Sequence, residues 1–284
     1  MKLVRKLLLT LIVLIVLIAG LFFGGVMYLN KKYDIDTFST FSTMKKLQMP
    51  VEESEVVKNP YSEKDLLSTK TKFSLSYDGF LKEESDGLSF HPDAIQNGVR
   101  SDIYLTDREL ACLLEEAVKA EMDSKIDIGG YLFSFSVRSL SIKVEDEKTS
   151  VLSFVCLIDI SDLRKAFTGL AGMVFGRYVP KFFYLTISFE NIHGEEAFSY
   201  SVKPEGLVLN TLTVEESASL FTTIGKFVSF PEADKVTEAF STCFMDNLIG
   251  TESDKGLLYS MKPYGVRDYS FVNYNNENCF CIEA

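Results

Sequence analysis

The chain has 284 residues, of which 46% are hydrophobic and 24% are charged, and its formal net charge is −11. All 40 acidic side chains but only 26 of the 29 basic ones follow residue 29, so residues 30–284 carry a net charge of −14. A domain this acidic is repelled by phosphate groups, which excludes the class of nucleic-acid-binding proteins. For the same reason, any approach of the domain to a lipid surface must use apolar side chains.

The first element is the uncharged run LLLTLIVLIVLIAGLFFGGVMYL, residues 7–29. A helix of about 20 apolar residues spans the hydrocarbon core of a bilayer, whereas the apolar core of a signal peptide has about 7 to 15 and ends in small residues. Bulky Phe23, Met27 and Tyr28 lie where a signal peptidase requires small side chains. The sequence therefore predicts an uncleaved signal anchor that spans the membrane at residues 7–29.

The basic residues beside this run predict its orientation, because they favour the cytoplasmic side. Lys2, Arg5 and Lys6 precede the run, and only Lys31 and Lys32 follow it closely. We expect residues 1–6 in the cytoplasm and the remainder of a single-pass cell-membrane protein in the extracytoplasmic space.

Gly20 and Gly24 form a G-x-x-x-G pattern within the predicted span. This spacing lets two transmembrane helices pack closely, and it predicts a homodimer contact. The alternative is that glycine is simply frequent in membrane-spanning helices.

Residues 30–69 contain two prolines, many charges and the tandem FSTFST, without a sustained apolar period. We expect a juxtamembrane stalk there, followed by an extracytoplasmic domain at residues 70–284. The alternation of Phe73, Leu75 and Tyr77 favours a strand at the start of this domain.

A helix is expected next, around YLTDRELACLLEEAVKAEMD. Thr106 and Glu109 have the spacing of a capping box, in which each side chain bonds the other residue's backbone N–H. The apolar stripe that follows is typical of a helix packed on a core: Leu110, Leu113, Leu114, Ala117 and Val118.

The run YLFSFSVRSLSIKVE, beginning at residue 131, is long for a strand. Tyr131 through Val137 alternate on one face, but Leu140 through Val144 alternate on the other, so the apolar side switches near Arg138. Either a β-bulge redirects the strand or a long twisted strand serves two cores. The turn EDEKT and the strand SVLSFVCLIDI complete a predicted antiparallel hairpin.

Strands and helices continue to alternate after this hairpin. A glycine-rich apolar helix is expected after Ser161. Three placements are open for it: over a sheet, as a mobile lid, or in the bilayer surface. Strands are expected at residues 181–193, 197–203 and 207–210, then helices opened by Thr213 and by Pro231, then carboxyl-terminal strands. The predicted class is α+β, with long antiparallel curved strands packed with several helices.

No catalytic signature, metal cluster or cofactor motif is found, and we expect a non-enzymatic protein without a cofactor. His193 lies among three glutamates at a strand turn, which suits a general base or metal ligand but is more typical of a polar turn. The five cysteines include Cys279 and Cys281, two apart on one strand face; buried thiols are favoured, with a disulfide left open.

The chain has 23 phenylalanines and 13 tyrosines, many on the apolar faces of the expected strands. They form either an ordinary aromatic core or an apolar cleft for a lipid or other amphiphile. The residues expected to line such a cleft, with the last two as a gate, are Phe133, Phe135, Phe154, Phe183, Leu185, Phe189, Met173 and Phe175.

The anchor, the segment LTDRELACLLEEAV, the long hairpin and FGRYVPKFFYLTISF together resemble the YpmS-like proteins of Gram-positive bacteria. The resemblance covers roughly residues 100–195 and the anchor, and this chain departs from the pattern by a longer carboxyl half. It implies a cell-surface anchored protein and transfers no catalytic residues.

Three functions follow as hypotheses. The first is a membrane-anchored extracytoplasmic protein that binds an apolar or envelope ligand such as lipid. The second is an envelope scaffold or assembly factor that acts through protein partners. The third is an envelope hydrolase that uses an unrecognised pair of carboxylates.

Overall fold

The structure is a computed structural model that describes residues 30–32, 34–84, 87–95, 101–122, 125–128, 131–159, 182–228, 232–252 and 256–284. The predicted span at residues 7–29, with Gly20 and Gly24, and the glycine-rich helix after Ser161 lie outside these ranges. No helix within them is both long enough and apolar enough to cross a bilayer.

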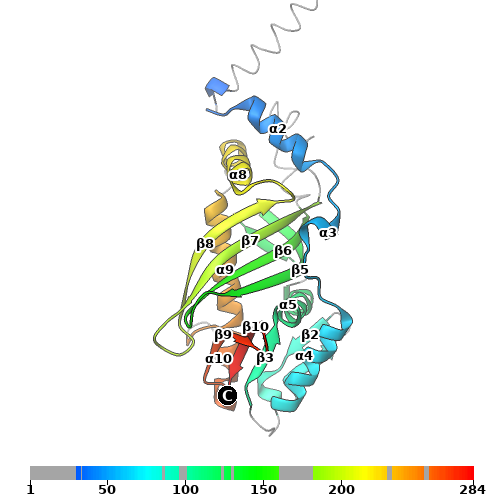
Figure 1. Ribbon diagram of the computed structural model, residues 1–284, viewed down its shortest axis with the longest axis vertical. Helices are drawn as coiled ribbons and strands as arrows, with labels where there is room; N and C mark the ends of the chain where they lie inside the picture. The colour runs from blue at the N-terminus through cyan, green and yellow to red at the C-terminus, as the bar shows by residue number, and fades with distance from the viewer. Residues whose placement is uncertain are drawn as a thin grey trace, which may run out of the picture.

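Three antiparallel sheets and several helices make up an elongated α+β fold, as the sequence predicts (Figure 1). The sheets have the strand orders β4-β5-β6-β7-β8, β3-β10-β9 and β1-β2. The strands are β1 Leu81–Glu84, β2 Gly87–Phe90, β3 Ile103–Thr106, β4 Lys125–Ile128, β5 Tyr131–Val144, β6 Thr149–Asp159, β7 Phe182–His193, β8 Tyr200–Leu209, β9 Asp268–Tyr274 and β10 Glu277–Glu283. The helices are α2 Thr37–Leu47, α3 Glu53–Val56, α4 Glu63–Ser76, α5 Asp107–Met122, α8 Val214–Val228, α9 Ala233–Leu248 and α10 Leu257–Met261, with 3-10 turns η1 Pro92–Ala94 and η3 Lys262–Tyr264.

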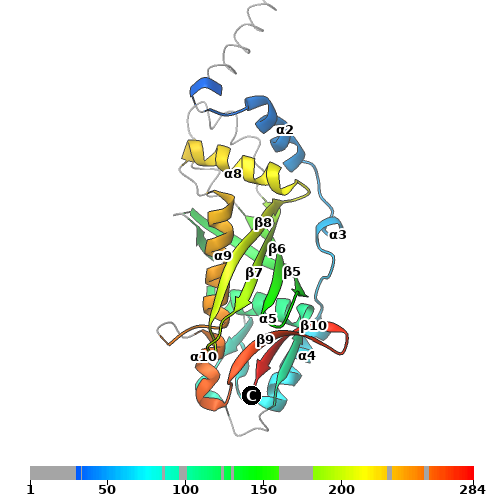
Figure 2. The same ribbon diagram turned by 60° about the vertical axis from the view of Figure 1, so that its left-hand side comes forward.

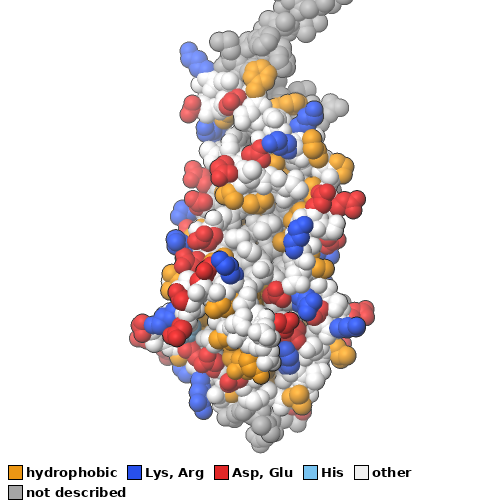
Figure 3. All heavy atoms as spheres, viewed as in Figure 1, with side chains coloured by type: hydrophobic (Ala, Val, Ile, Leu, Met, Phe, Trp, Pro, Cys, Tyr) orange, Lys and Arg blue, Asp and Glu red, His pale blue; other side chains and the backbone are white. Residues whose placement is uncertain are grey.

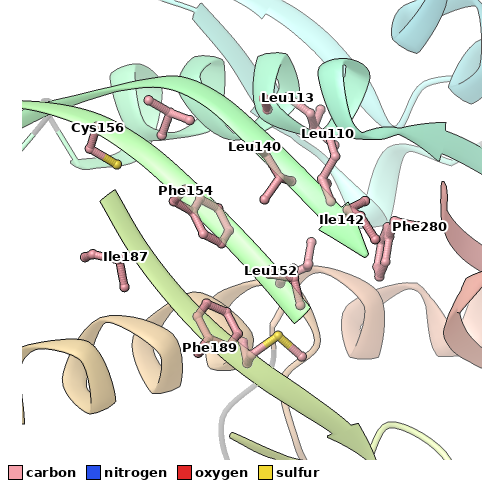
Figure 4. Packing of buried hydrophobic residues seen from close by; sticks show 14 of the residues in the cluster. Leu110, Leu113, Leu140, Ile142, Leu152, Phe154, Cys156, Ile187, Phe189 and Phe280 are labelled. Atoms are coloured by element: carbon pink, nitrogen blue, oxygen red, sulfur yellow. The ribbon is translucent and has the colours of Figure 1, made fainter. Parts of the chain in front are cut away.

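Helices α5 and α9 pack against the same face of the five-stranded sheet, which we call the inner face (Figures 1 and 4). Leu110 and Leu113 of α5 lie beside Leu140 of β5 in Figure 4. The ring of Phe154 in β6 lies 4.7 Å from that of Phe244 in α9. The apolar face of the sheet is thus covered by two helices that are far apart in the sequence.

The apparent switch of the apolar side within β5 is a β-bulge. Val137 pairs with Cys156 and Ser139 pairs with Val155, so Arg138 is an extra residue without an opposite partner in the ladder. One extra residue shifts the side-chain alternation by one position and returns Leu140 to the inner face. Of the two explanations that the sequence left open, the bulge is correct.

A side chain from α5 and one from the segment before α4 satisfy the backbone at the bulge. The N–H of Val137 donates to Glu115 Oε2 at 2.6 Å, and Tyr61 Oη donates to the carbonyl of Val137 at 3.2 Å. Ser136 Oγ also donates to Glu115, whose side chain is only 5% exposed. A buried backbone group without a partner is unfavourable, so these side chains fix the bulge at Arg138.

The expected stalk at residues 30–69 is different in the structure, because this segment forms α2, α3 and the start of α4 and contributes to the core. Ile35, Met44, Leu47 and Val57 are at most 7% exposed. The expected strand around Phe73 is the last part of α4, which opens where Asp65 Oδ2 accepts the N–H of Ser62 at 2.8 Å. The packing of this helix against the rest of the domain therefore outweighs the strand-like alternation of its local sequence.

The other expected elements are largely confirmed. The capping boxes at α5 and α8 form, with Thr106 N–H on Glu109 at 2.8 Å and Thr213 N–H on Glu216 at 3.1 Å. The two short strands expected at residues 197–210 are a single strand, β8, with a register shift opposite Ser188 and Phe189. Helix α8 lies between α2 and the end of the sheet, whereas β9 and β10 lie at the opposite end of the molecule (Figure 2).

We expect Glu115→Ala to lower the free energy of unfolding by about 2–3 kcal/mol, because it leaves the Val137 N–H buried without an acceptor. Urea unfolding of the detergent-solubilised full chain, followed by tyrosine circular dichroism, measures this change. Glu116→Ala, which removes only a surface pair with Lys119 on the same helix, serves as the control with an expected loss of less than about 0.5 kcal/mol. Equal losses for the two variants would contradict the role of Glu115.

Candidate functional site

The described members of the predicted cleft lie together on the inner face of the five-stranded sheet. Phe154, Phe183, Leu185 and Phe189 are at most 8% exposed. The Phe154 ring stacks with Phe189 at 5.9 Å (Figure 4). Both rings also contact Phe244 of α9. In the described part of the chain these four side chains belong to the packed core.

The remaining members of that prediction are not placed by the structure. Phe133 and Phe135 belong to β5, where their backbones pair with Ile126 and Ile158, but their side chains are outside the description. Met173 and Phe175 lie outside the described residues. The apolar cleft therefore stays a prediction.

His193 has a structural environment. Its Nε2 lies 3.2 Å from Asp268 Oδ1 and its Nδ1 lies 2.8 Å from the carbonyl oxygen of Gly194. The same Asp268 oxygen accepts the N–H groups of Phe198 and Tyr269, both at 2.9 Å. Through these contacts the imidazole joins the β7–β8 turn to β9.

Metal and thiol chemistry have equally little support within the described residues. No group of three or more His, Cys, Asp or Glu side chains there is arranged to hold a metal ion. All five cysteines are free thiols, and four are buried. Burial raises the pKa of Cys112, Cys156 and Cys281 to about 12, which leaves these thiols protonated and unreactive at neutral pH.

The site that the structure offers instead is a groove of about 390 Å³ between α4, β3 and the β9–β10 hairpin, which we call the distal groove. Three segments form it: the last turns of α4, residues 101–106, and the hairpin tip. The hairpin turn has positive φ at Asn275 (52°) and Asn276 (65°), as a tight two-residue turn requires. Its lining residues include Lys72, Leu75, Asp102, Tyr104, Tyr274 and Glu277.

Lys72 joins α4 to β3 and α5 beside the distal groove. Its Nζ donates to the carbonyl oxygen of Tyr104 and to Glu109 Oε2, both at 2.7 Å. Glu109 is 4% exposed and also accepts from Ser68 at 2.5 Å. The buried carboxylate is therefore paired, and the lysine occupies the backbone edge of β3.

The opening of the distal groove is apolar and aromatic. Leu75 is 71% exposed and Tyr274 is 45% exposed, and the Tyr274 ring stacks on Tyr104 at a centroid distance of 3.9 Å. Partial burial, followed by the neighbouring Cys281 and Asp102, raises the pKa of Tyr104 to about 12, so the Tyr104 hydroxyl is protonated at neutral pH. With Lys72 paired to Glu109, Asp102 and Glu277 give the groove a negative rim.

Sequence reasoning missed the distal groove because it assigned one wall to a stalk and a strand. Two local signals were available: the Ser62–Asp65 spacing, which is typical of a helix start, and the Asn275–Asn276 pair, which is typical of a hairpin turn. The approach of α4 to β3 and the hairpin has no such signal. This approach brings α4 together with β3, roughly 30 positions later in the chain, and with the hairpin, roughly 200 positions later.

We expect Phe154→Ala to lower the free energy of unfolding by about 3–5 kcal/mol, because the substitution leaves a cavity among packed aromatic rings. Thermal and urea unfolding of the full chain measure the loss. Phe182→Ala, on the same sheet but 52% exposed, is the matched control, with an expected loss of about 1 kcal/mol or less. A Phe154→Ala variant that keeps its free energy of unfolding but no longer binds a lipid would instead support the apolar cleft.

No protein-family model, curated protein or solved structure matches the chain. The resemblance to YpmS-like proteins accordingly stays an expectation from the sequence. The arguments for a site in this chain come from its own residues and their geometry.

Proposed function

We propose that the chain is a single-pass membrane protein whose extracytoplasmic domain binds a partner protein in the distal groove and catalyses no reaction. The exposed Leu75 and Tyr274 side chains at a formed groove are the observation that carries this proposal. Exposed apolar side chains of this size that converge on a concave surface mark interaction sites.

A protein segment fits the distal groove better than a sugar or a nucleotide does. A sugar site presents an open aromatic face with several polar donors, whereas Tyr104 and Tyr274 stack on each other and the exposed Leu75 offers no hydrogen bond. A nucleotide would bring phosphates to the carboxylates of Asp102 and Glu277, and these would repel it. An apolar side chain packed against Leu75 and Tyr274 needs no hydrogen bond and carries no negative charge, so it avoids both problems.

The charge at the rim specifies the partner further. Asp102, next to β3, and Glu277, on the hairpin, both line the groove. A partner segment with lysine or arginine beside an apolar residue would pair with them, and the net charge of −14 would speed its approach. We therefore propose a basic and apolar extracytoplasmic segment as the ligand.

Selection of displayed peptides on the full chain in nanodiscs tests this proposal. We expect enrichment of peptides with Lys or Arg next to a leucine or an aromatic residue, and an affinity loss of about tenfold or more for Tyr274→Ser and Leu75→Ser. Glu277→Gln should weaken the same peptides and reduce the salt dependence of their binding. Leu67→Ser is the matched control, because Leu67 is 66% exposed on α4 without lining the groove.

Peptides that bind equally to all four variants would overturn the distal groove as the site. Extraction of the same purified chain with organic solvent tests the competing lipid hypothesis. Near one lipid per chain, with no enrichment of peptides, would favour the apolar ligand that the sequence suggested.

The proposed topology is tested by thiol labelling in intact cells. In a Cys243→Ser background, which removes the half-buried thiol, we expect a membrane-impermeant maleimide to label Tyr274→Cys at once. Lys2→Cys should react only after the membrane is permeabilised, because the positive amino terminus is expected inside. The reverse pattern would show that the orientation is inverted.

A further inference from the structure

The outer surface of α2 combines exposed apolar side chains with lysines. Phe38 is 54% exposed, Phe41 is 42% exposed, and Met49 just beyond the helix is 55% exposed. At 100° per residue Phe38, Phe41 and Lys45 point to one side of the helix axis, and Met49 follows the end of the helix. Figure 3 shows hydrophobic and lysine side chains next to each other over α2 at the upper end of the molecule.

The opposite side of α2 is held firmly against the domain. Met44 and Leu47 are at most 3% exposed, and the Asn210 side chain donates to the carbonyl oxygen of Leu47 at 2.9 Å. Lys46 forms an ion pair with Glu216 of α8. The exposed side of α2 is therefore a rigid surface of the domain and not part of a loose linker.

The position of α2 in the chain brings this surface close to the predicted span. Seven residues, 30–36, separate residue 29 from the start of α2. A fully extended chain covers at most about 3.6 Å per residue, so α2 begins within about 29 Å of the end of the apolar run. The described chain also starts at the same end of the molecule as α2 and α8 (Figure 1).

The charge of this segment is opposite to that of the domain. Residues 30–49 contain four lysines and two aspartates and carry a net charge of +2, whereas residues 30–284 carry −14. Anionic head groups repel the domain as a whole but attract this part of it. Phenylalanine with flanking lysine is the composition of helices that lie in the plane of a membrane surface.

We propose that the outer surface of α2, formed by Phe38, Phe41, Lys45 and Met49, rests on the surface of the bilayer that holds residues 7–29. This inference rests on the membrane anchoring in the proposed function. The apolar side chains enter the boundary between head groups and acyl chains, and Lys45 remains at the level of the phosphates. The contact fixes the domain upright, with the distal groove directed away from the membrane.

The absence of tryptophan from the chain permits a direct test, since any introduced tryptophan is a unique reporter. We use the full chain in nanodiscs of phosphatidylcholine and phosphatidylglycerol whose acyl chains carry bromine, a contact quencher. Phe38→Trp and Phe41→Trp should lose at least about half of their emission relative to unbrominated nanodiscs. Tyr274→Trp, at the other end of the domain, is the matched control and should keep its emission.

A further reporter separates this inference from the anchoring on which it depends. Val26→Trp lies inside the predicted span and should be quenched if residues 7–29 cross the bilayer. Quenching of Val26→Trp without quenching of Phe38→Trp and Phe41→Trp would overturn the α2 contact and leave the anchoring intact. No quenching at any position would overturn both, and blue-shifted but unquenched emission at Phe41→Trp would show that a protein covers α2 instead.

Lys45→Glu in the Phe41→Trp background tests the electrostatic part. We expect weaker quenching in nanodiscs that contain phosphatidylglycerol and little change in those of phosphatidylcholine alone, because only the charged head groups distinguish the two side chains. Equal quenching in both compositions would contradict an attraction between Lys45 and anionic lipid.

Discussion

The β-bulge at Arg138 is the constraint on which the rest of this fold depends. A fourteen-residue strand without it would turn half of its apolar side chains away from the core, since alternation has a period of two. The extra residue keeps Val137 and Leu140 on the same face, and the Glu115 carboxylate and the Tyr61 hydroxyl satisfy the backbone that the bulge leaves unpaired. The strand can then remain long enough to serve as one wall of a single continuous core.

The length of these strands separates the two ends of the molecule. Helices α2 and α8 cover one end, where the described chain begins, and the three-stranded sheet with α4 forms the other (Figures 1 and 2). Each end exposes apolar side chains, while the inner face between them is packed with α5 and α9. A membrane contact at one end and a protein contact at the other are compatible because they share no residues.

Paired polar groups join segments that are distant in the sequence. Lys72 and Glu109 fix α4 to α5 and β3, Asp268 fixes the β7–β8 turn to β9, and Asn210 fixes the end of α2 to the sheet. Each would be unfavourable if its partner were missing, so each favours one arrangement of the elements over others. The same pairing ties His193 and the buried carboxylates to other segments of the protein.

The sequence by itself determined the features that depend on neighbouring residues. Capping boxes at Thr106 and Thr213, the hairpin of residues 131–159 and the α+β class follow from local hydrogen bonding and from apolar periodicity, and the structure confirms them. Only the tertiary structure decided that Phe154 and Phe189 pack against α9, that residues 30–69 belong to the domain, and that Tyr104 and Tyr274 meet at a groove. The physical reason is that an apolar side chain has the same local pattern whether it faces a ligand, a helix or solvent. What covers it is set by segments that the chain brings together only on folding.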